Sequence, residues 1–80
     1  MKLIIATCQY PVGPDLPKNT RYVLRQMRQA KDCGAHVVHF CEGALSGYAG
    51  TDFDSFDAFD WPDLESCTLR VMDLAHELNP

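Results

Sequence analysis

The sequence predicts an α/β fold with the element order β-α-β-α. Short apolar runs rich in β-branched residues occur at 2–8 and 35–41, and each is the length of a strand. Between them and after the second, apolar residues recur at helical spacing. A strand, a long helix and a second buried strand make a βαβ unit, so we expect parallel strands joined by a right-handed crossover.

The first strand is expected over 2–8, because the apolar run is continuous there. Such a run is typical of a strand covered on both faces. A loop follows, since its prolines and glycine fit neither a helix nor a sheet ladder. These residues are Pro11, Gly13, Pro14 and Pro17.

The first helix is expected to begin at Asn19 or just before it and to end at Cys33, with Gly34 beyond the helix end. Its predicted buried face is Val23, Leu24, Met27 and Ala30. The last helix begins near Pro62, with Asp63 and Glu65 beside its positive dipole end. It buries Leu64, Cys67, Val71, Leu74, Ala75 and Leu78, and Asn79-Pro80 stops it.

Eighty residues make one domain at most. Two parallel strands are too few for a sheet that needs both faces covered. We therefore expect residues 1–80 to be the amino-terminal piece of a larger domain, or to need a partner that completes the sheet.

The composition is that of a globular chain, with 46% hydrophobic residues. The net charge of −4 gives no reason to expect nucleic acid as a partner. The run Leu3-Ile4-Ile5-Ala6 is too short for a signal-peptide core or a membrane span, which favours a cytoplasmic protein. Without a signal segment, reduced and mostly buried thiols are favoured over disulfides. The cysteines are Cys8, Cys33, Cys41 and Cys67.

Glu42 is the candidate functional residue. It follows an apolar strand directly, and strand ends are where open α/β sheets place their ligands. Gly43, Ser46 and Gly47 allow the close backbone approach that a pocket needs. A glutamate recessed at this point can have a raised pKa, which suits a general base. The alternative is a solvated carboxylate in a turn.

Cys41 is not expected to act with Glu42, because consecutive strand residues point to opposite faces. The same alternation separates His36 from His39, and no metal site is expected. No glycine-rich phosphate loop is present, so a nucleotide site is not expected either.

Two charged stretches are expected to be solvated. The basic residues of the first helix lie opposite its apolar stripe, with no aromatic residue among the exposed positions. They are Lys18, Arg21, Arg25, Arg28 and Lys31. The acidic stretch from Asp52 to Asp63 does not match a calcium loop. Its phenylalanines, at three-residue spacing, predict a loop or short turn pinned by aromatics, with Trp61 packed against them.

Together the pattern resembles the amino-terminal part of the nitrilase superfamily, the carbon–nitrogen hydrolases. The similarity rests on features in order along the chain: Gln9, Asn19, Gly34-Ala35, Phe40, Glu42 and Gly47-Tyr48. One departure is Cys41, where the family usually has proline before the glutamate.

The resemblance implies a four-layer α-β-β-α sandwich, incomplete in this chain, in a protein that commonly forms homo-oligomers. It also implies hydrolysis of a small amide, N-carbamoyl compound or nitrile by a Glu-Lys-Cys triad without a cofactor. Glu42 matches the triad glutamate, whereas the lysine and the nucleophilic cysteine would lie beyond residue 80. The alternative is a non-catalytic binding or assembly module with the same β-α-β-α start.

Overall fold

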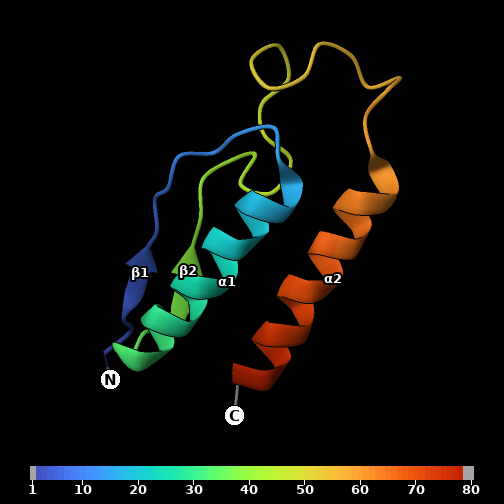
Figure 1. The fold of residues 1–80 in the computed structure, drawn as a ribbon. Coiled ribbons are helices and arrows are strands. Elements are labelled where there is room, and N and C mark those ends of the chain that lie inside the picture. Colours follow the sequence, from blue (N-terminus) through green and yellow to red (C-terminus); the bar gives the residue numbers. More distant parts are fainter. Residues whose placement is uncertain (1, 79–80) are drawn as a thin grey trace.

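A computed structural model describes residues 2–78, and its elements follow the predicted order (Figure 1). Strand β1 spans Ile5–Thr7, helix α1 spans Leu16–Asp32, strand β2 spans Val37–His39 and helix α2 spans Trp61–Leu78. The mixed α/β class is confirmed. The predicted stop at Asn79-Pro80 lies outside the described residues.

The sheet is parallel, as predicted, with Ile5 opposite Val37 and Thr7 opposite His39. Both strands are shorter than the apolar runs that predict them, because the ladder involves only three residues of each. Single hydrogen bonds extend the contact at both ends: the His36 amide donates to the Ile4 carbonyl, and the Cys8 amide donates to the His39 carbonyl.

The hydrophobic core lies around α1, which packs along α2 on one side and against the sheet on the other (Figure 1). Val23 and Met27 of α1 join Leu74 of α2 in its centre. Tyr10 and Phe40, from the loops that leave the two strands, pack against this centre. The predicted buried stripe of α1 is therefore confirmed, with Leu24 half-buried at its margin.

Helix α1 begins at Leu16, three residues before Asn19, because Asp15 caps it. The Asp15 carboxylate accepts the Lys18 N–H at 3.1 Å and so satisfies a free donor of the first turn. At the other end Cys33 is the cap, and Gly34 takes the left-handed conformation (φ +81°) that the predicted helix end requires.

Helix α2 buries a narrower face than predicted. Cys67 and Leu74 are buried, whereas Leu64, Val71 and Leu78 are half-buried. The prediction is wrong for Ala75, which is exposed because it borders a groove of about 360 Å³ that also reaches Val38 of β2.

Within residues 2–78 the two strands are covered on one face only. Leu3, Ile5 and Val37 are 64%, 56% and 44% exposed. Ala6 and Val38, which directly follow Ile5 and Val37 in the two strands, are half-buried. Strand alternation explains the difference, because α1 covers one face of the sheet only. The other face is an open apolar surface.

Candidate functional site

Glu42 lies in the turn that follows β2, and its side chain is exposed. The expectation of a recessed carboxylate is therefore wrong. The ladder ends at His39, so the chain has left the sheet before it reaches Cys41 and Glu42. Strand alternation consequently does not separate these two residues; instead Cys41 is half-buried while Glu42 faces solvent. An exposed carboxylate can still accept and deliver a proton if a substrate comes to it.

The turn beyond Glu42 is built on glycines, as predicted. Gly43 and Gly47 have φ of +69° and +81°, and the Gly47 N–H donates to the Gly43 carbonyl at 2.9 Å. A Cβ at Gly47 would lie 2.8 Å from the Gly13 carbonyl oxygen. Only glycine therefore allows this turn to lie directly against the loop after β1.

Asn19 holds the same two loops together from α1. Its side chain is 1% exposed. The Asn19 Oδ1 accepts the Gly13 N–H at 3.0 Å, and its Nδ2 donates to the carbonyls of Gly13 and Leu45 at 2.7 and 3.0 Å. Sequence reasoning marked Asn19 as a start of the first helix and as a feature of the resemblance, but missed this positioning role.

Cys41 is half-buried and influences two tyrosines that sequence reasoning did not connect to it. Burial, with Cys41 and Tyr48 nearby, raises the pKa of Tyr10 to about 12. A hydrogen bond with Cys41 raises the pKa of Tyr48. The Tyr10 hydroxyl donates to the Ala44 carbonyl, within the turn that begins at Glu42. Cys41 is therefore partly packed against the residues that support the turn, in agreement with a structural thiol.

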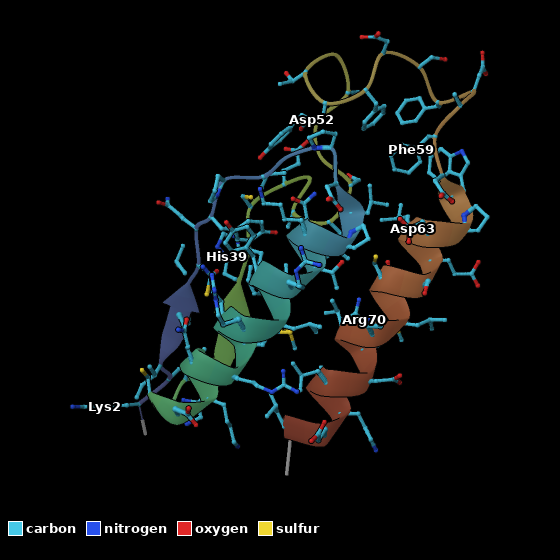
Figure 2. The ribbon with its side chains drawn as sticks, viewed as in Figure 1. Lys2, His39, Asp52, Phe59, Asp63 and Arg70 are labelled. Atoms are coloured by element: carbon cyan, nitrogen blue, oxygen red, sulfur yellow. The ribbon has the colours of Figure 1, made fainter. Side chains whose placement is uncertain are left out.

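Contacts between aromatic rings hold the loop from 48 to 61, as predicted. Phe53 lies 5.2 Å from Phe56 and 4.8 Å from Phe59 between ring centroids, and Trp61 lies 4.7 Å from Phe59. The Asp52 carboxylate accepts the Tyr48 N–H at 2.8 Å. Figure 2 shows Asp52 and Phe59 at one end of the molecule, with Lys2 at the other.

The remaining candidate ligands and thiols are dispersed. No group of three or more His, Cys, Asp or Glu side chains within residues 2–78 could hold a metal ion. His36 Nδ1 instead accepts the Ile4 N–H at 3.0 Å. All four cysteines are free, as predicted, and Cys67 is buried. The prediction of burial is wrong for Cys33, which is exposed because it caps α1 just beyond the buried stripe, and Cys8 and Cys41 are only half-buried.

In the part of the chain that the structure describes, neither helix is long and apolar enough to cross a membrane. Comparisons with protein-family models, with curated proteins and with solved structures gave no match.

Proposed function

We propose that this chain is the amino-terminal part of a carbon–nitrogen hydrolase of the nitrilase type, with Glu42 as its general base. The observation that carries the proposal is the position of Glu42 in a glycine turn just beyond the carboxyl end of a parallel strand. Ligands of open α/β sheets bind at this edge. The proposal includes a cytoplasmic location for this enzyme.

Two contacts support a positioned rather than an idle glutamate. Asn19 bonds to Leu45, three residues after Glu42, and the close approach of Gly47 to Gly13 fixes the far side of the turn. A general base must be held within hydrogen-bond reach of the proton that it takes. The backbone that carries Glu42 is thus restrained from two directions.

In the proposed reaction a cysteine from outside this chain attacks the amide or nitrile carbon of a small substrate. Glu42 takes the thiol proton as the carbon–sulfur bond forms, and delivers it to the departing ammonia or amine. It then removes a proton from the water that attacks the thioester, and returns this proton to the cysteine sulfur as the carbon–sulfur bond breaks and the carboxylic acid leaves. A lysine, also from outside this chain, stabilises the oxyanion. The chain alone is therefore inactive.

The proposal extends to the α-β-β-α sandwich. The open face of the sheet carries Leu3, Ile5 and Val37, each close to half exposed or more. A second sheet packed face to face would bury such a surface. Ile5→Ser should then lower the stability of the longest reading frame that contains this chain by about 2 kcal/mol or more. In residues 1–80 alone it should have little effect.

The decisive experiment measures ammonia release from small amides and nitriles by that longest reading frame. Glu42→Gln should lower kcat by about a hundredfold or more, because it removes a proton acceptor and keeps the side-chain size. Glu65→Gln is the matched control, since Glu65 is also exposed and lies on α2. Full activity in Glu42→Gln would refute the role of this residue, and a frame without lysine and cysteine downstream would refute the class.

A further inference from the structure

Positive charge is concentrated on one surface of this acidic chain. Of its seven lysines and arginines, five line a groove of about 700 Å³ along α1, bordered by α2. The basic groove consists of Lys18, Arg21, Arg25, Arg28 and Arg70, with Tyr22 and Leu24 between them. Asp32 is the only acidic residue in its lining.

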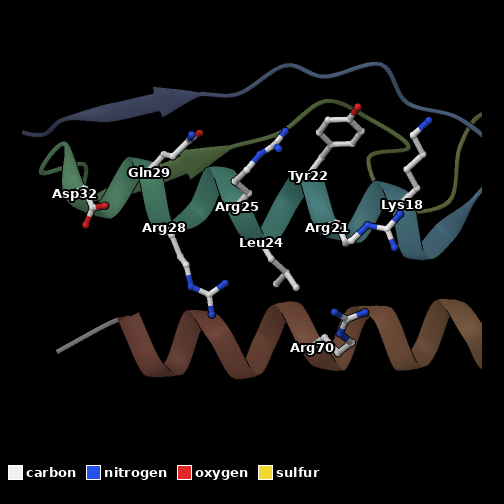
Figure 3. A pocket seen from close by; sticks show the side chains of 9 residues that line it. All are labelled: Lys18, Arg21, Tyr22, Leu24, Arg25, Arg28, Gln29, Asp32 and Arg70. Atoms are coloured by element: carbon white, nitrogen blue, oxygen red, sulfur yellow. The ribbon is translucent and has the colours of Figure 1, made fainter.

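Two further residues contribute to the basic groove besides the cations of α1. Arg70 comes from α2, and Figure 3 shows it facing α1, from which Leu24 and Arg28 extend toward α2. Tyr22 provides an aromatic ring, with the Arg25 guanidinium 5.2 Å from its centroid. Tyr22 itself is half-buried, so no aromatic residue stands among the exposed positions of this helix face.

This arrangement costs α1 stability when nothing is bound. Lys18, Arg21, Arg25 and Arg28 follow one another at intervals of three or four residues, so each neighbouring pair of like charges destabilises the helix. An ordinary solvated helix face alternates positive and negative charge. A bound anion would relieve the repulsion between these like charges.

We propose that the basic groove binds a linear polyphosphate group. Lys18 to Arg28 spans about 15 Å of helix, a length that favours several anionic groups in a row over a single ion. Arginine forks match phosphate oxygens in pairs. The source is either a free polyphosphate or the phosphate chain of a nucleotide, whose base would stack on the face of the Tyr22 ring that does not pack on Tyr10. This inference is independent of Glu42, which does not line the groove.

The test titrates residues 1–80 with tripolyphosphate and with adenosine triphosphate by calorimetry at about 20 mM salt, where screening is weak. Both should bind with a one-to-one ratio. Arg21→Gln/Arg25→Gln should weaken binding about tenfold or more, because it removes two charge-assisted contacts. Lys2→Gln/Lys31→Gln makes the same change in net charge outside the groove and should alter binding less than about threefold. All four positions are exposed, so circular dichroism should show unchanged helix content.

A substitution of Tyr22 distinguishes a nucleotide ligand from free polyphosphate. If adenosine triphosphate binds more tightly than tripolyphosphate, and Tyr22→Leu removes only that difference, the ligand is a nucleotide. Equal affinities that do not depend on Tyr22 indicate free polyphosphate.

Three results would overturn the proposal. One is the absence of tripolyphosphate binding. Another is an equal loss of affinity in the groove variant Arg21→Gln/Arg25→Gln and in the control variant Lys2→Gln/Lys31→Gln. The third is a dimer at low salt that Arg21→Gln/Arg25→Gln dissociates. That result would assign the groove to the acidic loop of a second copy.

Discussion

The Asn19 side chain donates to the Leu45 carbonyl oxygen at 3.0 Å, across 26 positions of sequence. This bond joins the first turn of α1 to the turn that carries Glu42. The same amide group bonds twice to Gly13 in the loop after β1. One buried side chain therefore sets the relative position of three segments at the edge of the sheet.

Replacement of Asn19 should destabilise the protein strongly. Asn19→Ala leaves the Gly13 N–H and two carbonyl groups without their partner, which costs about 2–4 kcal/mol. Urea denaturation followed by circular dichroism measures this loss. Gln29→Ala is the control, because Gln29 is exposed on the same helix and should change stability by less than about 0.5 kcal/mol. Equal effects of the two substitutions would contradict the positioning role.

The role of Asn19 also shows where sequence reasoning succeeds and where it stops. Periodicity predicted both helices and the buried stripe through Val23 and Met27, because these depend on residues close together in the chain. The β-α-β order predicted the parallel pairing of the strands. The bond from Asn19 to Leu45 and the approach of Arg70 to the cations of α1 depend on tertiary packing. No local pattern contains them.

Glu42 illustrates a second limit. The sequence predicts that Glu42 is recessed directly after an apolar strand, but two residues separate it from β2 and its side chain is exposed. The apolar run continues to Cys41, whereas pairing with β1 ends at His39. Hydrophobicity marks which residues could be buried, and the partner strand decides where the ladder ends.

Gly47→Ala should cost far more than Gly34→Ala, although both glycines have φ of +81°. The left-handed backbone alone costs a residue with a side chain about 1–2 kcal/mol. At Gly34 nothing lies within 4 Å of the added Cβ, so only this cost applies. At Gly47 the Cβ would lie 2.8 Å from both the Gly13 oxygen and an Asp52 carboxylate oxygen. Thermal unfolding of the two variants measures the difference, and a similar Tm for both would contradict the close approach.

The thiols should react in the order of their exposure. Cys33 is exposed and Cys67 is 2% exposed, so native labelling with iodoacetamide should modify Cys33 first and Cys67 last. Peptide mass spectrometry against time separates the four sites. In denaturant the order should disappear. Rapid labelling of Cys67 under native conditions would indicate that α2 does not pack on α1 as described.

Tyr10 should make the protein less stable at high pH. Its folded pKa of about 12 lies above the ordinary value of 10.0, because burial and the nearby Cys41 and Tyr48 disfavour the phenolate. Below pH 10 the hydroxyl is protonated in both states, and this contribution to stability is complete. As the pH rises from 10 toward 12 the unfolded chain loses its proton first, so the contribution is lost across that window. Absorbance titration should show a late phenolate step that Tyr10→Phe removes. Urea midpoints over the same range should fall less steeply in that variant, and an unchanged slope would contradict the burial of the Tyr10 hydroxyl against Ala44.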